Sequence, residues 1–234
     1  MTLTAAKATG KKIDGAGTTA ITDLHLTLDA NLALITSAGG RTAVFDDDKT
    51  FTGNMGTVTV NVAAGKTLTT TAAIANGKTT ADAGTTAITD LHVTPSADLT
   101  NIGSTNVTAA FGADATFTGT IGKAVVTVAD GATMTAAAVK VAGETINKTG
   151  SGKLAVTVGT ADANVNLTTI GGTAFDSVTV TENTTFTGTL DDTLKTSVNS
   201  GVKLTTTAAK VSGKTIDGAG TTEITALHLT LDAL

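Results

Sequence analysis

Histidine, whose side chain exchanges protons and binds metals near neutral pH, occurs three times, always in the phrase Leu-His-(Leu/Val)-Thr. These residues are His25, His92 and His228. No second histidine, cysteine or paired carboxylate accompanies any of them, whereas zinc needs several ligand atoms about 2.0–2.3 Å from one centre. We therefore predict exposed histidines on strands rather than a metal or proton-transfer site.

Clustered carboxylates could bind calcium, which takes about six to eight oxygen ligands. A run of three aspartates occupies 46–48, just before a Thr-Phe-Thr-Gly phrase, but its two equivalents in the chain keep only the last position, as Asp114 and Asn183. An isolated Asp or Asn is typical of a turn residue that bonds its own backbone. Calcium remains a minor hypothesis at the following residues: Asp46, Asp47, Asp48, Asp191 and Asp192.

Enzyme signatures are missing from the chain. There is no nucleophile elbow, no HExxH motif and no phosphate-binding loop. Polysaccharide cleavage by clustered Asp, Arg and Lys is also disfavoured, because Arg41 is the only arginine and the acidic residues fall mostly in predicted turns. We predict that the protein is not an enzyme and needs no catalytic cofactor.

Threonine makes up about a quarter of the residues and recurs in Thr-x-Thr phrases around one apolar residue. On a flat stacked sheet, such pairs would resemble the ice-binding surfaces of certain antifreeze and ice-adhesion proteins. Threonine is also simply a soluble, strand-compatible residue. Because the phrases recur on several predicted strands, binding of ice or a surface glycan by a Thr-rich face is our alternative hypothesis, not the first one.

A repeat of about 66 residues organises these features. All six phenylalanines fall at two equivalent places, the second always within Thr-Phe-Thr-Gly: Phe45 and Phe51, Phe111 and Phe117, Phe175 and Phe186. The repeat predicts one continuous array over residues 1–234 without linkers, with units at about 3–67, 68–133 and 134–203 and a partial unit at 204–234.

The first and last segments of the chain have the same place in the repeat. Residues 3–30 closely resemble residues 204–233. Two interpretations stay open: the chain is a piece of a longer array, or the matching phase allows one copy to continue into the next.

Composition restricts the partners. The net charge is −5 and there is only one arginine, so binding of nucleic acid is not expected. No apolar stretch reaches the roughly 20 residues needed to span a bilayer, so membrane insertion is not expected either. The absence of cysteine fits a large extracellular bacterial protein.

Short alternating segments indicate an all-β fold. Inward Val or Leu residues are predicted at 58–62, 154–158, 178–180 and 24–28, and Phe51, Phe117 and Phe186 are predicted to fill the core once per unit. A β-solenoid with two or three coils per unit fits better than tandem small β-sandwich domains, which need about 100 residues each. The stretch TAAAVKVAG at 135–143 could form one helical turn, but its equivalents near 72 and 208 are too short and too rich in threonine to support a helix.

The phrases LTTTAA, GAGTTAIT, ADLTNI and TFTG resemble the β-strand-repeat regions of giant bacterial surface proteins, namely large secreted adhesins and surface-layer proteins. The resemblance covers essentially the whole chain but includes no diagnostic motif. It implies an extracellular role at the bacterial cell surface, as part of a fibre, stalk or layer. The expected partner is a second copy of the chain, joined end to end or laterally.

Overall fold

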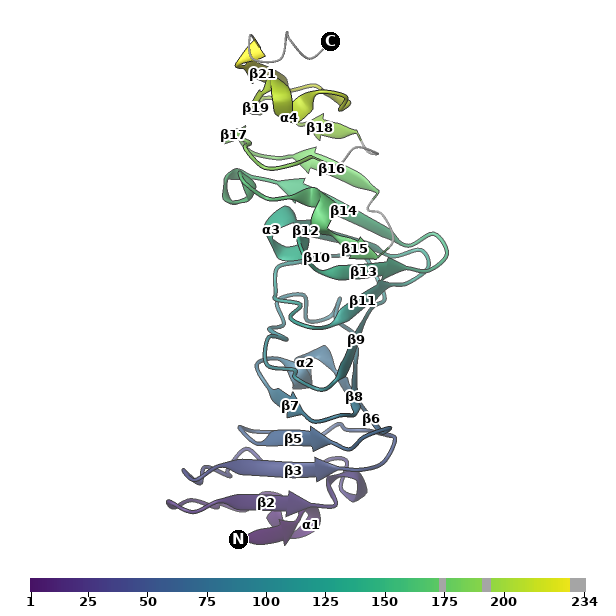
Figure 1. Ribbon diagram of the computed structural model, residues 1–234. Coiled ribbons are helices and arrows are strands. Elements are labelled where there is room, and N and C mark those ends of the chain that lie inside the picture. The colour runs from purple at the N-terminus through teal and green to yellow at the C-terminus, as the bar shows by residue number, and fades with distance from the viewer. Residues whose placement is uncertain (173–175, 191–194, 228–234) are drawn as a thin grey trace. The chain divides into compact units, whose positions relative to one another are not determined.

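The computed structural model describes residues 1–172, 176–190 and 195–227. Within these ranges the chain forms mainly short strands in parallel sheets, with a few short helices (Figure 1), which confirms the prediction of a β-rich fold. No helix there is long and apolar enough to cross a membrane. The chain divides into two compact units: residues 1–112 with 119–127, and residues 113–118 with those from 128 onward.

The first unit contains a sheet whose strands pair in parallel in chain order. They are β1 (Thr2–Thr4), β2 (Thr19–Thr22), β3 (Arg41–Phe45), β5 (Thr59–Val62) and β7 (Thr79–Ala81). Paired residues are 17 to 22 positions apart, as in the series Thr2, Ala20, Thr42, Thr59 and Thr79. The chain therefore returns parallel to itself about every 20 residues, and we call each return a rung.

A second set of parallel strands follows the same rule in this unit. It comprises β4 (Lys49–Thr50), β6 (Thr67–Thr71), β8 (Thr85–Thr89) and β9 (Asn106–Phe111). Their paired residues are 18 to 21 positions apart, from Lys49 opposite Leu68 to Thr85 opposite Asn106. Isolated parallel bridges, such as Ile13 with Ile35 and Asn31 with Asn54, hold the rungs together between the strands.

The second unit is built in the same way. One parallel sheet contains β10 (Ala115–Phe117), β12 (Thr133–Ala137), β14 (Lys153–Val158), β16 (Ser177–Val180), β18 (Thr196–Val198) and β20 (Ile216–Gly218). Another contains β17 (Thr184–Thr185), β19 (Lys203–Thr207) and β21 (Thr221–Thr225). This unit also contains β13 (Thr145–Lys148) and β15 (Gly171–Gly172), which pair in parallel, whereas β11 (Val125–Val128) belongs to the first unit except for its last residue.

The 66-residue sequence repeat does not contain a whole number of rungs. Leu3 of β1 and Leu68 of β6 are equivalent in the repeat, yet β1 pairs with β2 whereas β6 pairs with β4 and β8 in a different sheet. If rungs are counted from Leu3 along the sheet of β1, Val60 is reached after three rungs and Thr80 after four. Leu68 lies between these two residues in the sequence. Each repeat thus holds slightly more than three rungs, and equivalent residues move from one sheet to another.

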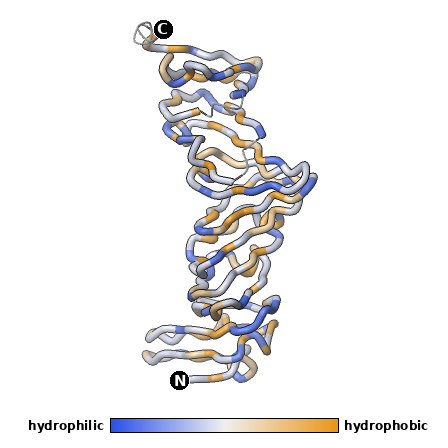
Figure 2. The backbone as a smooth tube through the Cα atoms, turned by 45° about the vertical axis from the view of Figure 1, so that its right-hand side comes forward, coloured by the Kyte–Doolittle hydropathy of each residue, from blue (hydrophilic) through white to orange (hydrophobic). Residues whose placement is uncertain are grey.

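The core consists of the inward residues of successive rungs. Val58, Val60 and Val62 are at most 1% exposed, as are Leu154, Val156, Val158, Val178 and Val180, so the predicted alternation is confirmed at these strands. Phe51, Phe117 and Phe186 are also buried, as predicted. Figure 2 shows apolar and polar residues alternating along the chain, as expected for strands with one buried face.

The phenylalanine pair is altered in the third repeat. β3 ends at Phe45, six residues before Phe51, whereas β16 ends at Val180, six residues before Phe186. Val180 is fully buried and therefore takes the place of Phe45. Phe175, which we paired with Phe186 from the sequence, lies outside the described residues.

The sequence-based rejection of helices is wrong. One helical turn follows the first strand of every repeat, as α1 (Ala5–Ala8), α2 (Ala72–Ala75), α3 (Ala138–Val141) and α4 (Ala208–Val211). Thr71 caps α2 by accepting a hydrogen bond from the Ile74 N–H at 3.4 Å. Alanine has the highest helix propensity, and four residues are too few to show a helical period.

The strand predicted at residues 24–28 is also absent. Leu24–Leu26 forms a 3₁₀ helix, η1, in which Leu24 is buried and Leu26 is 72% exposed. The preceding Asp23 has φ 57°, and its equivalent Asp90 has the same value. This left-handed conformation, which aspartate tolerates better than most residues, ends the strand before the leucines. Two further 3₁₀ helices are η2 (Thr160–Asp162) and η3 (Leu167–Thr169).

Some threonines point inward instead of outward. Thr80, Thr86 and Ser104 are at most 1% exposed, and their hydroxyl oxygens lie 2.8–3.2 Å from one another. Thr19 and Ser37 form the equivalent buried pair at 2.8 Å. Because hydroxyl groups can both donate and accept, these clusters satisfy one another inside an otherwise apolar core.

Candidate functional site

The described histidines do not form a shared site. His25 lies in η1, with its side chain 15% exposed and its Nδ1 atom against the carboxylate of Asp46. His92 instead accepts a hydrogen bond from the Gly112 N–H at 3.1 Å and packs edge-on against Phe111. The prediction of exposed strand histidines is therefore wrong for His25 and for His92, which lies in a turn and is partly buried, while His228 lies outside the described residues.

The three aspartates at 46–48 point to three different partners. Asp46 faces His25, and Asp47 accepts a hydrogen bond from the Asp48 N–H at 2.9 Å while lying 3.6–3.7 Å from two lysine ammonium groups. That N–H, together with Lys49 and Lys66, holds the pKa of Asp47 below its ordinary value. Calcium binding by these carboxylates stays a hypothesis, and Asp191 and Asp192 lie outside the described residues.

The third position of this triplet has the same role in every copy. Asp48 accepts a hydrogen bond from the Thr67 N–H at 2.6 Å, Asp114 from the Thr133 N–H at 2.7 Å, and Asn183 from the Lys203 N–H at 2.7 Å. Each acceptor lies 19 or 20 residues before its donor, which starts the next rung. We predicted a turn residue bonding its own backbone. The side chain bonds the following rung instead, and we call these three residues the rung clamps.

Removing one rung clamp should weaken the fold measurably. In Asp48→Ala, the Thr67 N–H loses its acceptor, and we expect a loss of about 1 kcal/mol in the free energy of unfolding. Asp48→Asn is the matched control because asparagine serves as the clamp at position 183 and keeps the acceptor oxygen. Urea unfolding followed by circular dichroism measures both. Equal stability of the Ala and Asn variants would contradict a clamping role.

The Thr-Phe-Thr-Gly phrase also joins one rung to the previous one. Thr52 and Gly53 both donate backbone hydrogen bonds to the Leu28 carbonyl, at 2.8 and 3.0 Å. In the third repeat, Thr187 and Gly188 donate to the Ala163 carbonyl in the same way. A Cβ atom added at Gly53 would lie 2.2 Å from the Ala30 carbonyl oxygen, so glycine allows the two backbones to approach.

Further carboxylates connect rungs in the second unit. Asp130 accepts hydrogen bonds from the N–H and hydroxyl of Ser151 at 2.7 and 2.8 Å, and Glu182 accepts from the same two groups of Thr160 at 3.0 Å. These bonds, led by the backbone N–H groups, hold the pKa values of both carboxyls below their ordinary values of 3.8 and 4.5.

These lowered pKa values predict that the free energy of unfolding decreases in acid. Since the folded-state pKa is below the unfolded one, the stabilisation is present above about pH 5 and is lost as pH falls through the folded-state pKa values. We expect Asp130→Asn/Glu182→Gln, which keeps acceptor oxygens but cannot titrate, to lose less stability than the parent chain between about pH 6 and pH 3. Urea midpoints at the two pH values provide the measurement, and identical losses would refute the assignment.

Outward threonines form one notable column on the sheet of β1. Its five rungs carry Thr2, Ala20, Thr42, Thr59 and Thr79. The neighbouring outward column carries Thr4, Thr22, Val44, Asn61 and Ala81, so threonine pairs do not recur on each rung. On the strands β6, β8 and β9 the outward columns are likewise interrupted, for example by Ala87 between Thr69 and Thr108.

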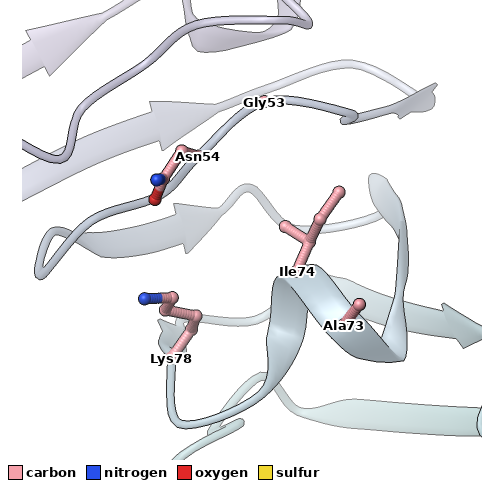
Figure 3. A pocket seen from close by; sticks show the side chains of 5 residues that line it. All are labelled: Gly53, Asn54, Ala73, Ile74 and Lys78. Carbon is pink, nitrogen blue, oxygen red and sulfur yellow. The ribbon is translucent and has the colours of Figure 1, made fainter. Parts of the chain in front are cut away.

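Two surface hollows lie beside the first two helical turns. The one shown in Figure 3 is lined by Gly53, Asn54, Ala73, Ile74 and Lys78. The Asn54 side-chain oxygen already accepts the Gly56 N–H at 2.9 Å, and Lys78 is the only charged group of the lining. The other is lined by Thr2, Leu3, Thr4, Lys7 and Thr22. The second lining holds threonine hydroxyls and the Lys7 amine, and neither lining has a His, Cys, Asp or Glu side chain that could bind a metal ion.

The described residues contain no group of three or more His, Cys, Asp or Glu side chains that could hold a metal ion. No protein-family model matches the chain, and no curated protein or solved structure is significantly similar to it.

Proposed function

We propose that the chain is an extracellular structural repeat protein that forms or extends a fibre, stalk or layer on a bacterial cell surface. One observation carries this proposal: two residues that recur in the repeats, the Asp or Asn of the rung clamps and the glycine of Thr-Phe-Thr-Gly, join one rung to another. The rung clamps bond the following rung, and the glycine of Thr-Phe-Thr-Gly permits contact with the preceding one. Such a repeat preserves stacking rather than a reaction.

The fold that we propose is a β-solenoid. Its support is that paired strands are parallel and recur about every 20 residues within each unit. Tandem β-sandwich domains are built from antiparallel sheets, so this pairing favours the solenoid over that alternative. Small inward residues such as Ala43, Val60 and Ala136 suit a narrow interior.

Self-association follows from the edges of the sheets. Among the described strands, those at the edges of their sheets are β1, β4, β7, β10, β15, β17, β20 and β21. An unpaired strand edge offers backbone donors and acceptors to another chain. We propose that copies join end to end through such edges, with lateral association of copies as the other mode of building a layer.

Electron microscopy of the purified chain over a range of concentrations tests this function, with calcium and with chelator as separate conditions. Filaments or sheets of constant width are the expected result. Particles that stay single at every concentration would contradict self-assembly and leave only the role of a spacer. A change of state on adding calcium would assign the aspartates at 46–48 or 191–192 as ligands.

A second candidate function is binding of ice or a surface glycan, favoured by the column Thr2, Thr42, Thr59 and Thr79. Rungs about 4.8 Å apart would present the hydroxyls of Thr42, Thr59 and Thr79 at regular spacing, while Ala20 separates them from Thr2. Thr42→Lys/Thr79→Lys should then abolish thermal hysteresis or retention on glycan. If the parent chain shows neither thermal hysteresis nor retention on glycan, and the double variant forms the same filaments as the parent chain, this candidate is excluded and the structural role is favoured.

A further inference from the structure

Four Asn-x-Thr triplets in the chain match the acceptor sequence for N-linked sugars, which lies in surface loops of secreted proteins. Their asparagines are Asn106, Asn147, Asn166 and Asn183. Threonine forms about a quarter of the chain, so the triplet by itself carries little information. The contacts of the asparagine amide and of the threonine hydroxyl distinguish the four triplets.

Two of the triplets are engaged in contacts between rungs. The Asn183 side-chain oxygen is a rung clamp and accepts the Lys203 N–H at 2.7 Å. Asn147 is half-buried in β13, and the hydroxyl of the third residue of its triplet, Thr149, donates to the Val128 carbonyl at 3.3 Å. In both triplets one of the two polar groups thus binds another rung, and a transferring enzyme would have to compete with that rung for it.

The triplet that begins at Asn106 belongs to a regular strand. Asn106 and Thr108 are exposed on β9, which pairs with β8 from Asn106 to Ala109. Side chains two residues apart on a strand share a face, but their Cα atoms are roughly 6.5 Å apart. No hydrogen bond joins these two described residues, so the hydroxyl does not contact the amide.

The triplet of Asn166 differs because it binds itself. The Asn166 Oδ1 atom accepts the Thr168 hydroxyl at 2.7 Å and the Thr168 N–H at 3.1 Å. Both residues are exposed, whereas Leu167 between them is buried and its N–H donates to the Thr189 carbonyl at 3.0 Å. The Thr169 hydroxyl donates to the Asn166 backbone carbonyl at 2.7 Å and closes the turn. Amide and hydroxyl are therefore held side by side on the surface.

We infer that Asn166 is the residue of the folded chain that accepts an N-linked sugar. The co-reactant is a glycosyl diphosphate, a sugar whose anomeric carbon is esterified to a diphosphate. In the transfer, Asn166 Nδ2 forms a bond to this carbon, the bond from the carbon to the phosphate oxygen breaks, and the diphosphate leaves with the bonding electrons. The amide loses one proton to a base of the transferring enzyme.

The turn favours this reaction in two ways. Two donors on Oδ1 draw electron density from the amide, which makes the Nδ2–H group more acidic and eases loss of its proton. The turn also sets the hydroxyl against the amide in advance, which reduces the entropy lost on binding to the enzyme. Since only Nδ2 reacts, Oδ1 keeps both donors and the turn is retained in the product.

This inference goes beyond the proposed structural role and does not depend on self-assembly. The test uses the purified, folded full chain with a soluble N-glycosyltransferase that acts on Asn-x-Thr, and UDP-glucose as the glycosyl diphosphate. Peptide mapping by mass spectrometry gives the initial rate of transfer at each asparagine. Short synthetic peptides that carry the four triplets are measured in parallel. Dividing the rate in the folded chain by the rate in the peptide removes the preference of the enzyme for local sequence.

We expect this ratio to be at least tenfold higher at Asn166 than at each of the other three asparagines. Asn166→Gln should abolish the modification, while the matched control Asn106→Gln should leave it unchanged. Equal ratios at all four asparagines would overturn the inference. So would a folded chain that accepts no sugar at Asn166 although the peptide does.

A further variant tests the turn without changing the triplet. Thr169→Val removes the hydroxyl that donates to the Asn166 carbonyl and keeps the shape of the side chain. We expect the rate at Asn166 in the folded chain to fall at least twofold. Circular dichroism verifies that the variant is folded. An unchanged rate would contradict the inference that the turn selects Asn166.

Discussion

A chain carrying Gly53→Ala is expected to lose roughly 3–5 kcal/mol of its free energy of unfolding. The added Cβ would lie 2.2 Å from the Ala30 carbonyl oxygen and 2.7 Å from the Ala30 nitrogen, distances that real Cβ atoms do not adopt. Both contacts are to backbone, so no side chain can rotate away. Relief requires separating two rungs, which also weakens the hydrogen bonds of Thr52 and Gly53 to Leu28.

Gly17→Ala is the matched control for this prediction. Gly17 has no atom within 4 Å of the added Cβ and no positive φ, so its substitution should change stability by less than about 1 kcal/mol. Urea unfolding at neutral pH compares the two variants. Similar stability of both chains would mean that the rungs can separate freely at the Thr-Phe-Thr-Gly phrase, contrary to the close backbone approach at Gly53.

Phe51→Ala is expected to cost about 3–5 kcal/mol, because the side chain is fully buried and its removal leaves a cavity among packed rungs. Phe51→Leu keeps most of the apolar volume and should cost about 1–2 kcal/mol. Val44→Ala, at a position that is 39% exposed, should cost less than about 1 kcal/mol.

The order of these three losses is the test, measured by thermal or urea unfolding. If Phe51→Ala proved as mild as Val44→Ala, the phenylalanine would not be part of the core. Phe117→Ala and Phe186→Ala examine the same role in the second unit, where both side chains are 1% exposed.

Strand positions with strict alternation could be predicted from the sequence. Val58, Val60 and Val62 alternate with threonine and asparagine, and all three are buried. The period of two is a direct consequence of strand geometry, so it can be recognised in the sequence without knowing the partner strands. The buried phenylalanines were also predictable, since they are the largest apolar residues of each repeat.

Features that depend on contacts between rungs could not be predicted in the same way. Leu24 and Leu26 alternate like strand residues, but the left-handed Asp23 turns the chain and leaves Leu26 exposed. The inward hydroxyl of Thr70 bonds the Phe51 carbonyl of the previous rung at 3.0 Å, a partner 19 residues away. A local pattern contains no information about which distant backbone group comes to lie opposite.

The candidate carboxylates show the same limit. The third position of the aspartate triplet was recognisable as the one that keeps Asp or Asn, which is the signal that identifies the rung clamps. Its donor could be found only from the register, because Thr67 lies 19 residues further along the chain. Asp46 likewise faces His25 only because η1 and the end of β3 lie in adjacent rungs.

The mismatch between repeat length and rung length has a consequence for how such a gene can grow. Duplication of a 66-residue unit lengthens the array without interrupting it, but it places each copied residue on another sheet, as with β1 and β6. A surface substitution that spreads through the repeats by duplication is thereby distributed around the molecule. Duplication alone therefore tends to give every sheet the same kinds of surface residue. A binding stripe on one sheet requires separate mutations in each unit.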